Sequence, residues 1–387
     1  MKFKAGRRAA VPRHYATGLV RLALLREDRG VLRSSVMNKF VASGIALLAV
    51  AGLASAQGSP SIVWSAPTPG LGTNSVQAAA WSPTGESVAV GSSDRWFRLR
   101  LAADGALLYS LLEPKNSGGP GTIMYSLDAQ LVAVRNQSSG LVVRVQRMVD
   151  GLFVGSLVAT VGSSGLLSFT PDATLVAFTG DGTLSNWDLS QMTFLQVTGS
   201  GYLKQTTTFN VSPDGTLQTA ALNGTITVRR TSDAAVVAML PGRAPVTFSP
   251  DGSVLAARAD PASAITLWHT ADWSVLHQLT SPHPLEVVGA LRFGPDGQRL
   301  AVAGYEPFLD MGLWQQKGFI RLWSVAAGTA LVTYDQQTSL AVTSEIAWSP
   351  DGSRFVYGLY DGTVAVAQAP AAGGPAPAPA SSIAITR

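Results

Sequence analysis

Three histidines of the sequence are close enough together to suggest a metal site. His269, His277 and His283 all belong to one repeat unit of the chain, and imidazole nitrogens are common zinc ligands. His269 ends one expected strand, His277 lies within the next (274–279), and His283 follows in a loop. A strand of five or six residues spans about 17–20 Å. The three side chains therefore fall at different levels, and the sequence predicts no metal site and no cofactor.

Five aspartates offer a second chemistry, a ring of catalytic carboxylates. They are Asp172, Asp214, Asp251, Asp296 and Asp351. Each lies in a short turn of its own repeat unit, whereas glycoside hydrolysis needs two carboxylates at roughly 5–9.5 Å. Asp is favoured in such turns because its side chain hydrogen-bonds to the backbone nearby. The sequence also contains no nucleophile elbow, phosphate-binding loop or EF-hand pattern, so it predicts a protein that is not an enzyme.

A mixed basic and aromatic stretch, RWFRLR at 95–100, is the strongest hint of nucleic-acid binding. Alternation along a strand explains it more simply. The formal net charge of +4 is misleading, because the residues after 56 contain 18 Lys and Arg against 22 Asp and Glu. Nucleic-acid binding needs clustered cations, so the sequence predicts no nucleic-acid partner.

The elements that carry these residues repeat along the chain, and each repeat begins with a short turn. The seven turns are WSPTG (81–85), YSLDA (125–129), FTPDA (169–173), VSPDG (211–215), FSPDG (248–252), FGPDG (293–297) and WSPDG (348–352). Pro fixes φ in such a turn and Gly tolerates positive φ, so each turn joins two strands. A repeat of about 40–45 residues is typical of propeller blades.

Alternating runs between these turns predict further strands. Examples are SVLAARA (253–259) and RLAVAG (299–304). A second turn, often Asp-Gly or Asn-Gly as in NGTITVRR (223–230), leads into a third strand, and a fourth follows. The sequence therefore predicts an all-β fold, a seven-bladed β-propeller of four-stranded antiparallel blades that covers residues 57–368.

The third strands carry a resemblance to the WD-repeat family. DGTLSNWD (181–188), AITLWH (264–269) and GFIRLWS (318–324), together with the seven turns, resemble that family over residues 61–368. The Trp that is typical of the family corresponds to Trp187, Trp268 and Trp323, and in the other units to Arg100, Val145, Arg229 and Ala367. Its Gly-His dipeptide is missing from every unit. The resemblance implies a propeller whose rim loops bind other proteins.

A spare strand at the start of the repeats provides a check on this architecture. The last unit ends after its third strand, near Gln368, whereas SIVWSA (61–66) precedes the first unit. In WD propellers the N-terminal strand completes the final blade, which removes exposed sheet edges. We therefore expect residues 61–66 to complete the last blade.

The segment from 37 to 56 has the layout of a secretory signal peptide. A basic start at Lys39 is followed by an apolar stretch and by the small residues Ala54 and Ala56. Cleavage is expected after Ala56, and the mature protein is expected to be periplasmic or secreted. Because the chain has no cysteine, it must fold without disulfides.

The remaining ends are read from composition. Residues 1–36 form a basic leader, and we interpret it as a start site assigned too early, with Met37 as the first residue. The alternative is a long basic region preceding the signal peptide. Residues 369–387 are rich in Pro and Ala and predict a flexible tail.

One apolar segment interrupts the repeats. YEPFLDMGLWQQKG (305–318) lies between the second and third strands of the sixth unit, where two other units need only an Asp-Gly turn. Clustered apolar side chains rarely stay uncovered. Two interpretations remain: a hairpin that turns near 310–312 and folds back over its own blades, or a knob that binds a partner through Trp314 and Phe308. The candidate partner-binding residues are Tyr305, Phe308, Leu309, Met311, Leu313 and Trp314.

These observations predict an exported, monomeric propeller that acts as a non-catalytic scaffold and binds a protein partner through its rim loops. One alternative is a lactonase-like enzyme that uses the central channel, which requires ionisable groups from several blades. Another is an envelope propeller similar to TolB-like proteins, which also use Ser-Pro-Asp-Gly turns. Strand endings with Leu-Trp and the count of seven units favour the WD resemblance.

Overall fold

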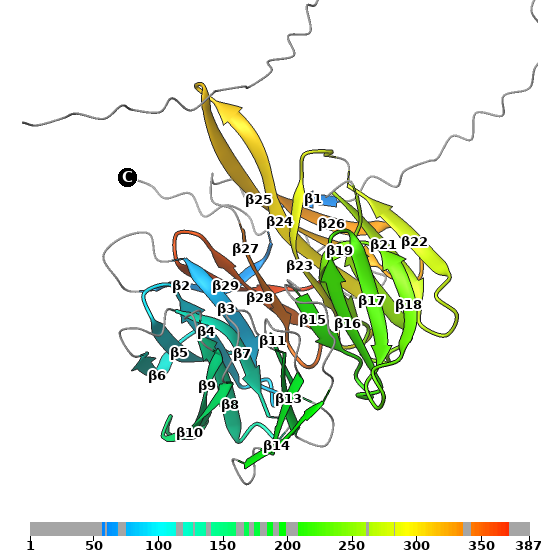
Figure 1. Ribbon diagram of the computed structural model, residues 1–387. Coiled ribbons are helices and arrows are strands. Elements are labelled where there is room, and N and C mark those ends of the chain that lie inside the picture. The colour runs from blue at the N-terminus through cyan, green and yellow to red at the C-terminus, as the bar shows by residue number, and fades with distance from the viewer. Residues whose placement is uncertain are drawn as a thin grey trace, which may run out of the picture. The chain divides into compact units, whose positions relative to one another are not determined.

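The computed structural model of the chain describes residues 56–370, with gaps (Figure 1). The gaps are 59, 69–74, 114–118, 127, 137–140, 160–165, 170–173, 179–183, 189–192, 199–207, 261–262, 282 and 336–341. The side chains of residues 56–58, 141–142, 157–209, 335 and 342–345 also lie outside the described part. The predicted basic leader, nearly all of the predicted signal peptide, and the tail beyond Pro370 lie outside the described residues as well.

The described residues contain 29 strands arranged in seven sheets and no helix. The first sheet consists of β3 (Val76–Trp81), β4 (Ser87–Ser92), β5 (Trp96–Leu101) and β6 (Leu107–Leu112). The second consists of β7 (Pro120–Tyr125), β8 (Leu131–Asn136), β9 (Leu141–Arg147) and β10 (Phe153–Ala159). The third consists of β11 (Leu166–Phe169), β12 (Thr174–Phe178), β13 (Leu184–Asp188) and β14 (Thr193–Thr198).

The fourth to sixth sheets continue in chain order. The fourth consists of β15 (Thr208–Val211), β16 (Leu217–Leu222), β17 (Thr225–Arg230) and β18 (Val236–Pro241). The fifth consists of β19 (Arg243–Phe248), β20 (Val254–Arg258), β21 (Ala264–His269) and β22 (Val275–Thr280). The sixth contains β23 (Val287–Phe293), β24 (Arg299–Asp310), β25 (Leu313–Ser324) and β26 (Ala330–Asp335).

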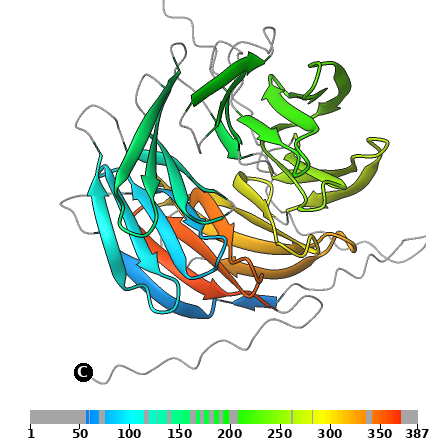
Figure 2. The same cartoon turned by 90° about the horizontal axis from the view of Figure 1, so that it is seen from below.

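The seventh sheet joins the two ends of the repeated region. It consists of β2 (Ile62–Pro67) followed by β29 (Thr363–Gln368), β28 (Arg354–Leu359) and β27 (Val342–Trp348). Strand β2 is antiparallel to β29, with Trp64 opposite Val366. Figure 2 shows the early strand, in blue, beside the late ones, in red. The sequence predicted this pairing.

Six of the seven sheets have four antiparallel strands, as predicted, but the sixth has a fifth strand. The added strand, β1 (Ala56–Gly58), pairs in parallel with β26, with Gln57 opposite Thr333. This strand has no signal in the sequence, because three residues beside a predicted cleavage site give no periodic pattern. The rest of the repeat pattern is an all-β arrangement of propeller-like sheets.

The apolar core lies between neighbouring sheets. One cluster joins Ile226 of the fourth sheet to Phe248, Leu255 and Trp268 of the fifth, and Trp268 is 2% exposed. Another cluster joins the sixth sheet to the seventh through Leu322 and similar residues. Because each sheet presents apolar side chains to both neighbours, nearly continuous buried runs such as that of β4 result.

Arginines at the starts of the second strands link successive sheets. Arg299 of the sixth sheet donates to the carbonyl oxygen of Gly352 at 2.9 Å, and Arg354, at the corresponding place in the seventh sheet, donates to Ala102 O at 3.3 Å. The indole Nε1 of Trp64 donates to the same Ala102 oxygen at 2.9 Å. The seventh sheet is therefore hydrogen-bonded directly to the residue that follows β5 of the first sheet.

Candidate partner-binding hairpin

Strands β24 and β25 form the longest hairpin of the described residues. Their register continues to the pair Asp310–Leu313, so that the connecting loop contains two residues. These residues, Met311 and Gly312, have φ values of 46° and 81°. Positive φ at both positions defines a type I′ turn, whose twist matches that of antiparallel strands. The predicted turn near residues 310–312 is confirmed.

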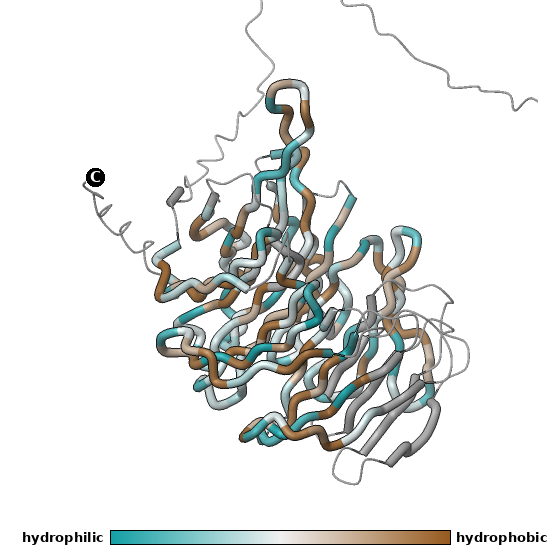
Figure 3. The backbone as a smooth tube through the Cα atoms, turned by 90° about the vertical axis from the view of Figure 1, so that its left-hand side faces the viewer, coloured by the Kyte–Doolittle hydropathy of each residue, from teal (hydrophilic) through white to brown (hydrophobic). Residues whose placement is uncertain are grey.

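The outer half of this hairpin extends beyond its sheet. Strand β23 pairs with β24 no further than Val287 opposite Tyr305, and β26 pairs with β25 no further than Asp335 opposite Phe319. Within the described pairings, residues 306–317 therefore pair with one another alone. The projecting segment is visible in Figure 1, and Figure 3 shows hydrophobic residues along it.

The apolar side chains of this segment are exposed. The exposed fractions are 97% for Met311, 71% for Trp314, 66% for Leu313, 61% for Leu309 and 36% for Phe308. Tyr305, at the foot of the hairpin, is half-buried. The interpretation in which the hairpin folds back over its own sheets is therefore wrong. Because the ladder is regular up to the turn, the hairpin holds these side chains away from the core.

The two faces of the projecting segment differ in charge. Side chains of directly opposed residues share one face of a sheet, and successive pairs alternate between faces. One face carries the pairs Tyr305–Gly318, Pro307–Gln316 and Leu309–Trp314, and the other carries Glu306–Lys317, Phe308–Gln315 and Asp310–Leu313. All the charged residues lie on the second face. The first face, which we call the apolar face, is uncharged and dominated by Leu309 and Trp314.

The two edges of the projecting segment differ as well. In a two-residue hairpin the closing pair, Asp310 and Leu313, exchanges hydrogen bonds, so the next pair directs its backbone groups outward. The outward positions are Trp314 and Gln316 on β25, and Leu309 and Pro307 on β24. Pro307 has no N–H, and proline protects edge strands against further pairing. The β25 edge, which contains no proline, is therefore the better acceptor of another strand.

A buried ion pair fixes the foot of the hairpin. Arg321 of β25 donates through both terminal nitrogens to the carboxylate of Glu286, each at 2.9 Å, and both side chains are 3% exposed. Its Nε donates to Thr333 Oγ1 at 3.0 Å, and Ser281 Oγ contacts both members of the pair. A buried pair is stable where its remaining hydrogen-bonding groups are satisfied. The base of the hairpin is therefore rigidly held between β23 and β26.

The same register position carries arginine in two other sheets. Arg321 is opposite Val302, Arg98 is opposite Val90 and Arg144 is opposite Val134. Arg98 pairs with Asp94 at 2.6 Å. Arg144 pairs with Glu113 at 3.1 Å.

These ion pairs were not among the residues predicted from the sequence. A signal was present, because in the sixth unit the arginine stands two residues before the Trp position, as Arg98 stands two before Arg100. The register also corrects one equivalence of the second sheet. Val132 is opposite Gln146, so Gln146 and not Val145 corresponds to Trp323. The carboxylate partners of these arginines and the equivalence of Gln146 both become clear only from the strand pairing, which the degenerate sequence of the second unit does not reveal.

Two further positions show what replaces tryptophan. Arg100 donates to the carbonyl oxygen of Gly105 at 2.8 Å, and Arg229 donates to that of Ala234 at 2.9 Å. Each arginine thus closes the turn that follows its own strand. Trp187 belongs to a segment whose side chains lie outside the described residues.

The aspartates of the first turns stabilise those turns. In the fifth sheet Ser249 Oγ donates to Asp251 Oδ1 at 2.6 Å, and the same oxygen accepts the Ser253 N–H at 3.1 Å. Asp214 and Asp351 accept the same bond from their serines, also at 2.6 Å. The hydroxyl of Ser349, and then the groups of Ser353, lower the pKa of Asp351 to about 2. These residues therefore form turns, as predicted.

Asp296 makes different contacts from those three aspartates. Asp296 bonds to Gln298 N at 2.9 Å and pairs with Arg299 at 2.8 Å, because its turn has glycine in place of serine. Asp172 lies outside the described residues.

The three histidines occupy separate places in the described structure. His277 Nε2 lies 3.0 Å from Ala326 O, and His283 Nδ1 lies 3.6 Å from the Glu306 carboxylate at the foot of the hairpin. His269 is exposed at the end of β21. No three metal-ligating side chains come together among the described residues.

Comparisons with known proteins give no family. No protein-family model matches the sequence, and no curated protein matches it significantly. Within the described part of the chain there is also no helix with the length and hydropathy to cross a membrane. The structure thus defines a class, an all-β protein built from repeated, propeller-like antiparallel sheets, with one projecting hairpin.

Proposed function

We propose that the chain is an exported seven-bladed β-propeller of WD-like type, in which β2 completes the last blade. The seven sheets support this architecture, because the first strand of each contacts the first strand of the next. Strand β27 likewise contacts β3, and Arg354 bonds to Ala102. The layout of residues 37–56 supports export.

We further propose that this propeller is a non-catalytic scaffold that binds a protein partner through the projecting hairpin. The exposed apolar face around Leu309 and Trp314 carries this proposal. Each apolar side chain of this size gains about 1.5–3 kcal/mol on full burial. Aromatic anchors surrounded by smaller contacts are typical of binding hot spots. A partner that covers the apolar face would therefore gain affinity without any change in the propeller.

The free edge of β25 supports a specific mode of binding. An added strand would pair with the backbone groups of Trp314 and Gln316 while the partner covers the adjacent apolar face. Pro307 blocks the opposite edge. The scaffold is preferred to the lactonase-like alternative because the ionisable clusters of the described residues, such as Arg321–Glu286, are ion pairs that support strands. It is preferred to the TolB-like alternative because of the Leu-Trp strand endings and the seven repeat units.

Shortening the hairpin tests this function. Replacing residues 307–316 by Asn-Gly retains every pair between β24 and its neighbour β23. It also places the new turn on the pair Glu306–Lys317, which alternates in phase with the closing pair Asp310–Leu313, so the sheets are expected to remain folded. Crosslinking pull-downs from the cell envelope are compared for the wild type and the shortened chain, with thermal unfolding as the control for folding. The proposal expects the partner to be lost while the melting temperature is retained. Recovery of the same partners by the shortened chain would contradict it.

A further inference from the structure

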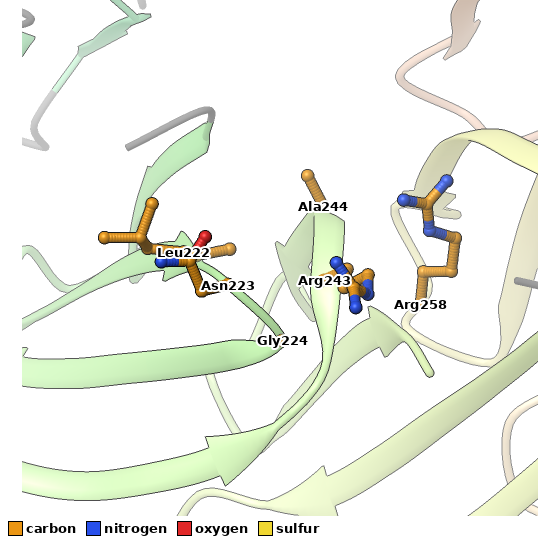
Figure 4. A pocket seen from close by; sticks show the side chains of 7 residues that line it. Leu222, Asn223, Gly224, Arg243, Ala244 and Arg258 are labelled. Carbon is orange, nitrogen blue, oxygen red and sulfur yellow. The ribbon is translucent and has the colours of Figure 1, made fainter. Parts of the chain in front are cut away.

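A second surface feature, separate from the hairpin, is a pocket at the rim of the fourth and fifth sheets. It is open, with a volume of about 270 Å³. Figure 4 shows the side chains that line it. They are Ala221, Leu222, Asn223, Gly224, Arg243, Ala244 and Arg258. The lining thus contains two guanidinium groups and an amide, and no carboxylate.

Arg258 stands at a position where most sheets have a very small residue. It is opposite Ile265 in β21, three pairs beyond the Leu255–Trp268 pair. The residues at the same register of four other sheets are Gly91, Ala221, Ala303 and Gly358. The propeller framework therefore does not require a long cation here. Arg135 of the second sheet is the other arginine at this register, and its Nε bonds to Thr122.

The guanidinium of Arg258 is only partly satisfied. Its Nη1 donates to Val288 O at 3.3 Å, while its Nε is buried and has no hydrogen-bond partner among the described residues. Burial, and then the positive charge of Arg243, lower the pKa of Arg258. A buried donor without a partner is costly. A bound anion would supply the missing acceptor and the missing negative charge.

The neighbouring charges leave this pocket positive. Arg243 pairs with Asp260 at 3.1 Å, but the Asp260 side chain is 69% exposed and such pairs are weak. Asn223, in the turn between β16 and β17, stands where the first sheet has Asp94, which pairs with Arg98. At this turn the fourth sheet therefore has the neutral amide of Asn223, where a carboxylate would reduce the positive charge of the pocket.

We propose that this pocket binds a small oxyanion, a carboxylate or phosphate group, through the guanidinium groups of Arg258 and Arg243. The planar fork of arginine matches the two oxygens of either group, and charge-assisted hydrogen bonds of this kind are short and strong. The Asn223 amide supplies a further donor at the edge of the pocket. This site is additional to the scaffold function and does not depend on the hairpin.

Calorimetric titration at low ionic strength tests the site, with inorganic phosphate in one arm and succinate in the other. The wild type should bind at least one probe, and the arm that gives heat identifies a phosphate or a carboxylate ligand. Arg258→Ala should weaken binding at least ~10-fold, because it removes a partly buried charge from the complex. Alanine occupies this register in two other sheets, so folding should be retained.

Asn223→Asp provides an independent test within the pocket. It introduces the carboxylate that the first sheet has at this turn, and it should weaken anion binding roughly threefold or more. Arg230→Gln is the matched control, because Arg230 is an exposed arginine of the same sheet that pairs with Asp233. Binding by this control should equal that of the wild type.

The proposal is overturned if the wild type binds neither probe. It is also overturned if Arg258→Ala or Asn223→Asp binds as tightly as the wild type, or if Arg230→Gln weakens binding as much as they do. Circular dichroism melts verify that each variant is folded. If Arg258→Ala fails to fold, Asn223→Asp decides the question alone.

Discussion

The two halves of strands β24 and β25 differ in what they contact. In the inner half, which comprises β24 up to Tyr305 and β25 from Gly318 onward, the strands are buried in a sheet and held by core side chains and by the Arg321–Glu286 pair. In the outer half, residues 306–317, the same strands pair only with each other and expose Leu309 and Trp314. The inner half therefore stabilises the fold, whereas the outer half is available for another molecule. Changes in the two halves should have opposite effects on stability and on binding.

Two tryptophans make the sharpest contrast. Trp268 is 2% exposed in the core between the fourth and fifth sheets, and Trp314 is 71% exposed on the hairpin. Trp268→Ala should lower the free energy of unfolding by about 3–5 kcal/mol, because it leaves a cavity. Trp314→Ala should change it by less than about 0.5 kcal/mol, as surface substitutions do. Urea unfolding measures both, and equal effects would contradict the contrast.

The ion pair at the foot of the hairpin should give the next largest effect. Glu286→Ala leaves Arg321 buried without its carboxylate, at a cost of about 3 kcal/mol, the lower end of the range for broken buried pairs. The lower cost is expected because Thr333 and Ser281 still accept hydrogen bonds from Arg321 in this variant. Replacing both partners, with Glu286→Leu and Arg321→Met, should recover much of this loss. Denaturant unfolding of the single and double variants decides, and a double variant as unstable as the single one would count against the interpretation.

The first turns should contribute less, and in a pH-dependent way. The folded-state pKa of Asp351 is lowered to about 2, below its ordinary value, so its contribution is complete above the unfolded-state pKa of about 3.9. This stability is lost as the pH falls through about 2. Because the carboxylate is largely exposed, solvent screening reduces its contribution to about 1 kcal/mol. Asp351→Asn should therefore cost about 1 kcal/mol at pH 7 and nothing at the acid limit, where denaturation curves should coincide.

The turn of the hairpin should have the smallest effect on global stability. Gly312 has φ of 81°, and a Cβ there would meet no atom within 4 Å. Gly312→Ala therefore costs only the local conformational strain, about 1–2 kcal/mol, and this strain is confined to residues that pair with each other. Hydrogen exchange should become faster in the segment 306–317 while the melting temperature stays constant. A lower melting temperature would show that the projecting segment supports the core.

The sequence predicts the repeated sheets because their turns follow local rules. Ser249, Asp251 and Gly252 each have a role that depends on neighbours within five residues. The pairing of β2 with β29 was predicted for a similar reason, since a missing strand and a spare strand can be counted.

The rest of the site depends on contacts between distant segments. The Arg321–Glu286 pair joins residues 35 positions apart, and no local pattern relates them. The fold-back interpretation was wrong because it assumed that apolar side chains must be covered within the chain. The register of β24 and β25, which continues to Asp310 and Leu313, holds the hairpin straight.

The most direct test of the hairpin compares its two faces. Leu309→Ala with Trp314→Ala removes the apolar face, and Gln315→Ala with Lys317→Ala removes two half-buried side chains of the opposite face. Crosslinked partner is quantified for both double variants at equal melting temperature. We expect recovery to fall at least ~10-fold for the first pair, because aromatic anchors dominate interfaces, and to remain near that of the wild type for the second. Equal recovery by the two double variants would contradict binding through the apolar face.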